Sequence, residues 1–254
     1  MVVILSPSKA MTDKNARDFG KLSSPEFLEQ AIEIAKLVAH KPEEELMQWM
    51  SVSEKLAKDT YSKYQNWLSS GGMSNFPALF SYTGEVYSGL KADGFNKEDI
   101  AYANQYLRIM SGLYGLLKPM DNISPYRLEM AVKLQVDNYT NLYQFWKDYI
   151  TAALNQQIQS TDSQFLANLA SDEYYRAIKP SEISVPILQF EFYEMRNGSR
   201  KFISFNAKRA RGLMASFIIR NKIKSVDALH AFNIETYQYV PSEQQPYVLT
   251  FVKP

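Results

Sequence analysis

Cysteine is absent from this chain of 254 residues, and histidine occurs only twice, at His40 and His230. Thiolate metal sites, iron-sulfur clusters and histidine-rich metal centres are therefore excluded by residue inventory. Carboxylates are the remaining metal ligands, and their densest run, Glu43 to Glu45, follows Pro42 at a predicted helix start. Acidic side chains are expected there because they complement the helix dipole. We predict no metal site and no cofactor.

Long hydrophobic runs and a strong charge imbalance are also absent. Apolar runs such as Val2 to Leu5 are far shorter than the roughly 20 residues that cross a bilayer. No basic segment, long apolar segment and small-residue cleavage site of the secretory type follow Met1. We therefore expect a cytoplasmic protein with no membrane partner. The net charge of +1 gives no overall argument for nucleic acid.

The apolar pattern predicts a mixture of helices and strands. Val2 to Leu5 predict a buried strand, and Asn197-Gly198 predicts a hairpin turn. Helical spacing prevails from about residue 24 to residue 68. Further helices are expected at 96–110, 142–158, 171–174 and 206–221, and Asn96 with Asp99 predicts a capping pair at the start of the first of these. Further strands are expected at 78–82, 165–169, 185–194, 200–205, 237–240 and 247–252. Because no repeat or long linker divides the chain, we predict one α+β domain over residues 1–254, with a mixed sheet and surrounding helices.

Glycines, prolines and polar side chains interrupt an apolar stretch in the middle of the chain. Gly112 and Gly115 permit positive φ and close approach of another group. If residues 96–110 form a helix, Ser111 to Gly115 form the turn of a helix-hairpin-helix, which points backbone N–H groups at DNA phosphate. The match to that motif is partial, because the glycines are three residues apart and Pro119 cuts the second helix to about one turn.

Seven segments, taken in order, resemble a known family. They are Ser6 to Lys9, Gly84 to Leu90, Leu107 to Gly115, Pro125 to Met130, Leu142 to Trp146, Asn168 to Tyr174 and Ala210 to Met214. Together they make the chain similar, nearly end to end, to the YaaA family of bacterial peroxide-stress proteins. The resemblance implies a family-specific fold with a helix-hairpin-helix-like element. It also implies duplex DNA binding without strong sequence preference, and a cytosolic oxidative-stress role that limits free iron and DNA damage.

Positive charge is concentrated in one part of the chain. Residues 195–226 contain no Asp or Glu. On a helix, Lys208, Arg209 and Arg211 fall outside the apolar stripe, with short side chains between them, which would let a phosphate backbone approach. Alternatively, this face is simply solvated or pairs with acids of the N-terminal half. The predicted DNA-binding residues are Lys9, Ser111, Gly112, Tyr114, Gly115, Arg127, Lys208, Arg209 and Arg211.

Other polar residues predict a small-molecule pocket. Ser6 to Lys9 follow the first strand directly, where α/β folds present polar groups to ligands. Arg108 and Arg127 suit bidentate binding of phosphate, although Arg127 with Glu129 or Glu173 could equally form a buried ion pair. The predicted pocket residues are Ser6, Lys9, Arg108, Tyr126, Arg127, Glu129, Ser171 and Glu173. No catalytic triad, P-loop, dinucleotide fingerprint or zinc motif is present, so no catalytic residue is predicted.

Two functions follow from the sequence. The first is duplex DNA binding in a positive cleft. The alternative is an enzyme that acts on a nucleotide or nucleobase, and so binds a small phosphate-bearing ligand with the same polar residues. An open groove in the structure would support the first function, and a closed pocket of mononucleotide size would support the second.

Overall fold

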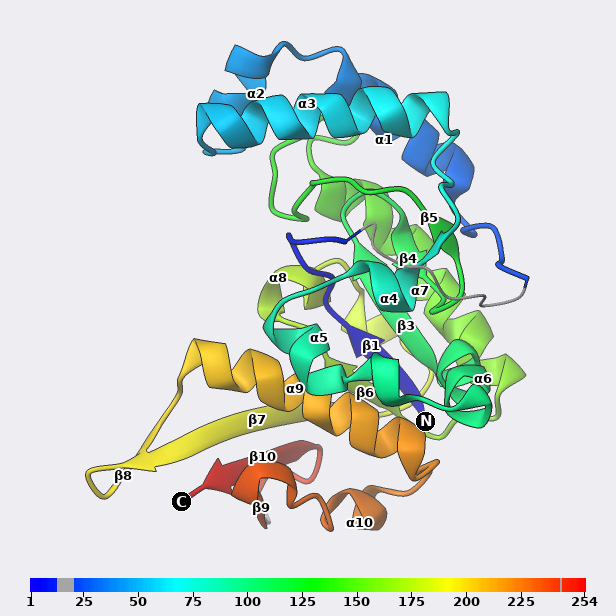
Figure 1. The fold of residues 1–254 in the computed structure, drawn as a ribbon. Coiled ribbons are helices and arrows are strands. Elements are labelled where there is room, and N and C mark those ends of the chain that lie inside the picture. The colour runs from blue at the N-terminus through cyan, green and yellow to red at the C-terminus, as the bar shows by residue number, and fades with distance from the viewer. Residues whose placement is uncertain (13–20, 243) are drawn as a thin grey trace.

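A mixed eight-stranded sheet forms the centre of the computed structural model, which describes residues 1–12, 21–242 and 244–254 (Figure 1). The strands are β1 Val2–Leu5, β2 Phe76–Pro77, β3 Leu107–Ser111, β4 Gly115–Leu117, β5 Asn122–Ile123, β6 Leu166–Leu169, β7 Ile187–Arg196, β8 Ser199–Lys201, β9 Gln238–Val240 and β10 Val248–Lys253. The order in the sheet is β4-β3-β1-β6-β7-β10-β9, with β8 beside β7, while β2 and β5 pair separately. This arrangement confirms the predicted mixed α and β fold.

Strand β1 lies between β3 and β6 and runs parallel to both. Val3 is in register with Leu107 on one side, and Val2 with Leu166 on the other. Every residue of β1 is at most 1% exposed, as a short apolar run inside a parallel sheet should be. After β1 the chain adds a strand first on one side and then on the other. The carboxyl end of β1 therefore lies at a topological switch point, where α/β sheets form ligand crevices.

Helices surround the sheet and also form a separate group. They are α1 Leu28–Ala39, α2 Glu43–Trp49, α3 Glu54–Ser69, α4 Ala78–Ser81, α5 Glu85–Leu90, α6 Lys97–Tyr106, α7 Leu142–Ser160, α8 Asp172–Tyr175, α9 Ser204–Arg220 and α10 Val226–Leu229. Short 3-10 helices lie at Ala92–Gly94, Pro180–Glu182 and Ile234–Thr236. Helix α9 packs against β1, β6 and β7, whereas α1, α2 and α3 gather at one end of the molecule (Figure 1). In the described parts of the chain, no helix combines the length and apolar character needed to cross a membrane.

Local sequence signals fix several element boundaries. The side chain of Asn96 accepts the Asp99 N–H at the start of α6, and the Asp99 carboxylate accepts the Asn96 N–H in return. Asn197 and Gly198 join β7 to β8 with φ of 50° and 74°, as a two-residue hairpin turn requires. This hairpin projects from the body of the molecule as an arm, at the lower left of Figure 1. The predicted capping pair and hairpin are therefore confirmed.

Helices α5 and α9 cross in direct backbone contact. A Cβ atom built on Gly212 would lie 1.8 Å from the carbonyl oxygen of Val86, so no side chain fits there. The crossing brings together Gly84 to Leu90 and Ala210 to Met214, two of the segments that carried the resemblance. It also fixes the side chains of α9 relative to the loop after β1.

Some sequence predictions of secondary structure are wrong. Residues 78–82 were expected to form a strand, but Ala78–Ser81 form α4. Helix α6 ends at Tyr106, and Leu107–Ser111 form β3, which pairs antiparallel with β4. The glycine turn is thus a β-hairpin, and the predicted helix-hairpin-helix is not confirmed. Short apolar runs fit a helix or a strand equally well, and parallel pairing with β1 decides in favour of a strand here. The predicted strand at 200–205 ends early, at Lys201.

Candidate functional site

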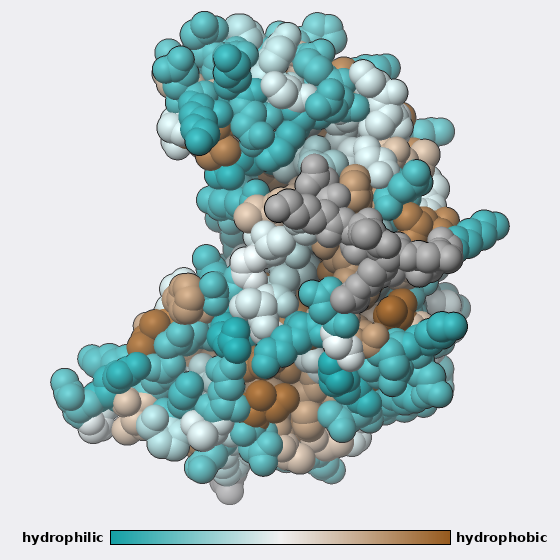
Figure 2. Space-filling view, in the orientation of Figure 1, coloured by the Kyte–Doolittle hydropathy of each residue, from teal (hydrophilic) through white to brown (hydrophobic). Residues whose placement is uncertain are grey.

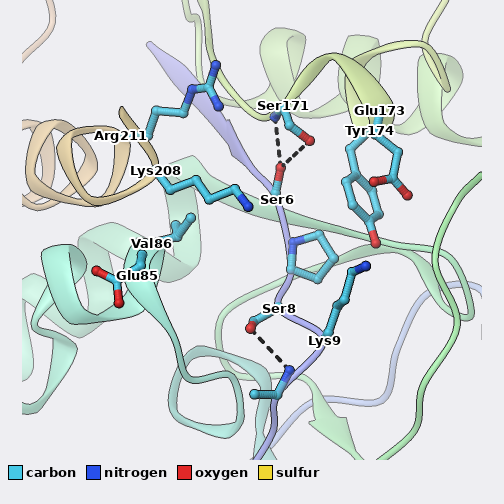
Figure 3. Close-up of a pocket in the computed structure, with 12 residues that line it drawn as sticks. Ser6, Ser8, Lys9, Glu85, Val86, Ser171, Glu173, Tyr174, Lys208 and Arg211 are labelled. Carbon is cyan, nitrogen blue, oxygen red and sulfur yellow. Dashed lines mark hydrogen bonds between the residues drawn. The ribbon is translucent and has the colours of Figure 1, made fainter. Parts of the chain in front are cut away.

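A cavity of about 310 Å³ opens where β1 ends (Figure 3). Its walls come from four parts of the chain: the loop after β1, the start of α5, the segment from Ser171 to Tyr174, and one face of α9. These segments meet because β1 pairs with β6 and α5 packs on α9. The cavity therefore occupies the switch point of the sheet.

Two serines connect the loops that follow β1 and β6. Ser6 Oγ donates to Ser171 Oγ at 3.2 Å and accepts the Ser171 N–H at 2.8 Å. The Tyr87 hydroxyl donates to the carbonyl oxygen of Ser6 at 3.1 Å and so attaches α5 to the same point. Because the Ser6 proton goes to Ser171 Oγ, the Ser171 hydroxyl retains its own proton for another acceptor.

Helix α9 contributes two cations to the cavity. Figure 3 shows Lys208 extending from α9 toward Ser6, with Arg211 beside it. Within the described ranges, neither side chain forms an ion pair with a carboxylate, and Arg211 Nε is buried without a hydrogen-bond partner. Burial lowers the pKa of Arg211, and the charge of Asp172 opposes that effect. A desolvated guanidinium without a partner is costly, so its position at a cavity wall indicates a place for an anion.

Two acidic side chains beside the cavity, Glu129 and Glu173, already have partners. Lys9 Nζ lies 2.7 Å from one oxygen of Glu129, and Arg127 lies 3.6 Å from the other. The Arg127 ion pair that the sequence left open is therefore formed with Glu129. Glu173 lines the cavity and accepts the Ala131 N–H at 3.3 Å. Lys9, with 59% of its side chain exposed, contributes charge at the cavity mouth.

The structure brings together half of the predicted pocket residues. Ser6, Lys9, Ser171 and Glu173 line the cavity, and Arg127 and Glu129 reach it only through the contact between Glu129 and Lys9. The other two predicted residues, Arg108 and Tyr126, lie in the interior.

Arg108 is 4% exposed and binds within the protein. Its guanidinium donates to the carbonyl oxygens of Asn104 and Leu107, at 3.0 and 2.7 Å, and to the side chain of Gln157. Burial lowers the pKa of Arg108 to about 10. The donors of Arg108 thus hold β3 and α6 to α7, which argues against the prediction that Arg108 binds a ligand.

The glycine turn between β3 and β4 is enclosed by protein. Ser111 and Tyr114 have no exposed surface, and Ser111 Oγ accepts the N–H groups of Leu113 and Tyr114 at 3.2 and 2.9 Å. The Tyr126 hydroxyl lies 2.6 Å from Ser111 Oγ and 2.9 Å from the Tyr82 hydroxyl. These N–H groups point into the protein rather than to solvent. The burial of the turn therefore argues against the predicted contact between it and a duplex.

Both glycines of this hairpin leave room for neighbouring groups: Gly112 for the backbone of residues 128–129, and Gly115 for the ring of Trp146. Gly115 has φ of +68°, and a Cβ built on it would lie 2.6 Å from the Trp146 ring. Trp146 Nε1 donates to the carbonyl oxygen of Gly112 at 2.9 Å. The residues 112–115 that suggested a phosphate-binding turn thus serve internal packing.

Arg209 is separated from the other two cations predicted on α9. Its guanidinium donates twice to Glu235 Oε1, at 2.9 and 2.6 Å, and also to Ser88 Oγ at 3.2 Å. The hydrogen bond to Glu235 raises the pKa of Arg209. This cation links α9 to the C-terminal part of the chain, whereas Lys208 and Arg211 face the cavity.

The arm carries polar and aromatic residues that the sequence analysis did not select. Arg200 and Lys201 on β8 are exposed, and no ion pair joins either one to a carboxylate of the described chain. Phe202 and Phe205, which follow them, are each 58% exposed. Their position could have been predicted from the sequence, because the Asn197-Gly198 turn places Arg200 and Lys201 near the tip of a hairpin. We call these four residues, 200–202 and 205, the arm surface.

Metal ligands do not gather at the cavity or elsewhere in the described residues. No group of three or more His, Asp or Glu side chains there is arranged to hold a metal ion.

Comparison with known proteins identifies the family. A family model described as peroxide stress protein YaaA matches residues 1–243. A UPF0246 protein of Aliivibrio fischeri (strain ATCC 700601 / ES114) is 40% identical over 252 residues, which cover 99% of this chain and 97% of the relative. The UPF0246 protein lpl1317 of Legionella pneumophila (strain Lens) is 38% identical over 255 residues, covering 100% of this chain and 99% of the relative. The chain therefore belongs to the YaaA family of peroxide stress proteins.

Proposed function

We propose that this protein binds double-stranded DNA without strong sequence preference through the arm surface. In this way it helps to limit free iron and DNA damage during peroxide stress. One observation carries the proposal: the exposed cations Arg200 and Lys201 lack carboxylate partners in the described chain and adjoin the exposed rings of Phe202 and Phe205.

Internal pairing distinguishes Arg200 and Lys201 from several other cations of the basic segment. Arg196 pairs with Glu194 at 2.7 Å, and Lys222 with Glu98 at 2.8 Å. Pairs of this kind neutralise positive charge within the protein. Arg200 and Lys201 remain free to neutralise phosphates, which releases condensed counterions and favours association with any duplex.

The exposed phenylalanines give the arm a second means of contact. Most large apolar side chains of the described protein are buried, whereas Phe202 and Phe205 are each 58% exposed. Apolar side chains beside cations contact sugars and base steps where a protein approaches a groove. A two-stranded ribbon is also an element that grooves of DNA admit. The composition and shape of the arm therefore both support contact with nucleic acid.

The outline of the molecule provides space for an extended partner. Figure 2 shows the surface hollowed between the helical end, which contains α1, α2 and α3, and the projecting arm. The arm forms one border of this hollow. An open recess of this kind suits a duplex better than the enclosed cavity at β1 does.

The proposed effect on iron follows from DNA binding. The chain offers no cysteine and only two histidines. Association with phosphates displaces cations from DNA, and displaced Fe(II) no longer reacts with peroxide at the DNA itself. DNA binding therefore protects the DNA directly. Because the displaced Fe(II) stays in solution, a fall in free iron requires a separate step after DNA binding.

The test is a double substitution, Arg200→Ala with Lys201→Ala. We expect weaker binding to unrelated duplexes alike, and a slope of log affinity against log salt that is lower by about 1.8, or 0.9 per lost phosphate contact. Fluorescence anisotropy with two labelled duplexes at several salt concentrations measures both quantities.

A matched control removes the same charge elsewhere. Lys97 and Lys224 are also exposed, at the start of α6 and just after α9. Changing both to Ala should leave the salt slope unchanged. Equal effects of the two double variants would show that only net charge matters, and the arm would then lose its assigned role.

A further inference from the structure

We propose that the cavity at the end of β1 is a separate site, which binds the phosphate monoester group of a single nucleoside monophosphate. This site goes beyond the proposed DNA binding, because phosphates within a duplex are diesters with one negative charge. A terminal phosphate monoester is close to a dianion at pH 7 and needs a more cationic site.

Cations outnumber carboxylates in the lining of the cavity, where Lys9, Lys208 and Arg211 face Glu85 and Glu173. Lys208 and Arg211 enter from the same helix, and in the described chain neither has a carboxylate partner. The buried Nε of Arg211 is a donor without an acceptor. A phosphate oxygen would accept that hydrogen bond, and Arg is the side chain best suited to bind phosphate with two parallel donors.

The hydroxyl groups of the cavity complete a set of donors. Ser171 Oγ accepts from Ser6, which leaves the Ser171 proton free. Ser8 Oγ likewise accepts the Ala10 N–H at 3.2 Å and keeps its own proton. Both hydroxyls line the same cavity as the cations. The site thus supplies neutral donors as well as charge to an oxyanion.

The opposite wall selects what is attached to the phosphate. Glu173 and Tyr174 lie across the cavity from Lys208 (Figure 3). Since Glu173 Oε1 accepts the Ala131 N–H, Oε2 is available to accept from a ribose hydroxyl or a base amino group. The carboxylate would repel a second or third phosphate. We therefore expect a preference for monophosphates over diphosphates and triphosphates.

The volume of the cavity limits the ligand to one small molecule. Ligand pockets usually measure about 300–1,000 Å³, and this cavity, at about 310 Å³, lies at the lower end. Such a group could come from a free mononucleotide or from the 5′-phosphorylated end of a DNA strand. The two sources share the chemistry that the cavity recognises.

Calorimetric titration of the full chain with AMP, GMP, CMP and UMP tests the proposal. Adenosine and inorganic phosphate serve as truncated ligands. We expect at least one monophosphate to bind with 1:1 stoichiometry, at least about tenfold more tightly than either truncated ligand. Arg211→Met should weaken that binding about tenfold or more, as loss of a charge-assisted hydrogen bond does.

Arg209→Met is the matched control on the same helix. Because Arg209 binds Glu235 instead of facing the cavity, this variant should retain the affinity for the monophosphate. Ser171→Ala is a second variant in the site, for use if Arg211→Met does not fold. It should weaken monophosphate binding several-fold. Thermal melting of each variant checks folding.

Blunt duplexes with and without a 5′-phosphate separate the two sources. If the wild type prefers the phosphorylated duplex and Arg211→Met does not, the site binds DNA ends, even where free monophosphates bind weakly. Arg200→Ala with Lys201→Ala should leave monophosphate binding intact, so failure of the arm proposal is distinguishable from failure of this one. Absence of both monophosphate binding and end preference, or equal binding by Arg211→Met, would overturn the proposal.

Discussion

The glycine hairpin and the cavity at the end of β1 are both rich in polar side chains, but their polar groups are used differently. Ser111 and Tyr114 in the hairpin, and Tyr126 beside it, hydrogen-bond to other protein groups and are at most 4% exposed. In the cavity, Lys208 lacks such a partner in the described chain, as does Nε of Arg211. The polar groups of the hairpin are therefore satisfied as in a core, whereas the cavity retains hydrogen-bond donors without acceptors in the described chain.

This difference shows how a polar residue within an apolar motif should be interpreted. A buried polar group stabilises the fold only when its hydrogen bonds are formed, and a group left without a partner costs free energy. Proteins retain such costs mainly where function requires them. Substitutions should accordingly destabilise the hairpin, while in the cavity they should affect binding more than folding.

The largest effect is expected for Gly115→Val in the hairpin. The variant must adopt a positive φ and place side-chain atoms where the Trp146 ring lies, only 2.6 Å from the Cβ position. We expect a loss of about 3 kcal/mol or more in the free energy of unfolding, measured by urea denaturation. Gly198→Ala is the control, because Gly198 also has positive φ but no atom within 4 Å of its Cβ position. Gly198→Ala should lower the free energy of unfolding by only about 1 kcal/mol. Equal losses in the two variants would show that contact with Trp146 does not explain the effect at Gly115.

The next effect concerns pH and Asp121, which follows the hairpin. Asp121 is 1% exposed, and burial raises its pKa from 3.8 to about 6. Hydrogen bonds from Ser23 and Lys118, and the charges of Lys118 and Arg108, lower this pKa but do not cancel the effect of burial. The folded protein thus holds a proton that the unfolded chain releases. This contribution to stability is complete below about pH 4 and is lost as the pH rises through about 6.

Asp121→Asn, which cannot ionise, should remove this dependence. Between pH 4 and pH 6.5 we expect the unfolding free energy of the wild type to fall by on the order of 2 kcal/mol relative to the variant. Urea denaturation of both proteins at three pH values in this range gives the difference. A difference that stays constant with pH would mean that Asp121 has an ordinary pKa.

A smaller effect of opposite sign is expected in the cavity. Arg211→Met replaces a desolvated cation with an apolar side chain of similar length. Because Arg211 has no carboxylate partner in the described residues, we expect stability to be unchanged or higher by about 1 kcal/mol. Thermal melting without added ligand provides the measurement. A marked loss of stability would place Arg211 with the hairpin residues, as a structural group.

No effect is expected when iron is added. With no cysteine and two histidines in the chain, we predict no stoichiometric tight Fe(II) site in either region. Anaerobic calorimetric titration should show no site of micromolar or tighter affinity. A single such site per chain, lost when carboxylates are replaced, would contradict this prediction and make the effect on iron direct.

Structural features that depend on neighbouring residues could be predicted from the sequence. The Asn96 cap and the Asn197-Gly198 turn are local devices, and both were predicted. Residues 107–110 were assigned to a helix, because their partner in the sheet, β1, lies about a hundred residues earlier. No local sequence pattern indicates that a segment pairs with a strand so far away in the sequence.

The candidate site was predictable to a similar extent. Ser6 and Ser171 follow strands directly, so their position at the edge of the sheet could be expected. Arg108 could not be excluded from the pocket, because only the tertiary structure shows that Gln157 and two backbone carbonyls bind it. The separation of Arg209 from Lys208 and Arg211 likewise depends on Glu235, which lies on another element.

The central place of β1 has a consequence for how the chain is made. Val2–Leu5 leave the ribosome well before their hydrogen-bonding partners, which are residues 107–109 and 166–169. At about 5–20 residues per second, β1 waits about 8 to 33 s before β6 has been synthesised. During this time a short apolar segment has two unpaired edges, which invites aggregation or capture by chaperones. A strand that is fully buried in the folded protein therefore stays unpaired for many seconds in the nascent chain.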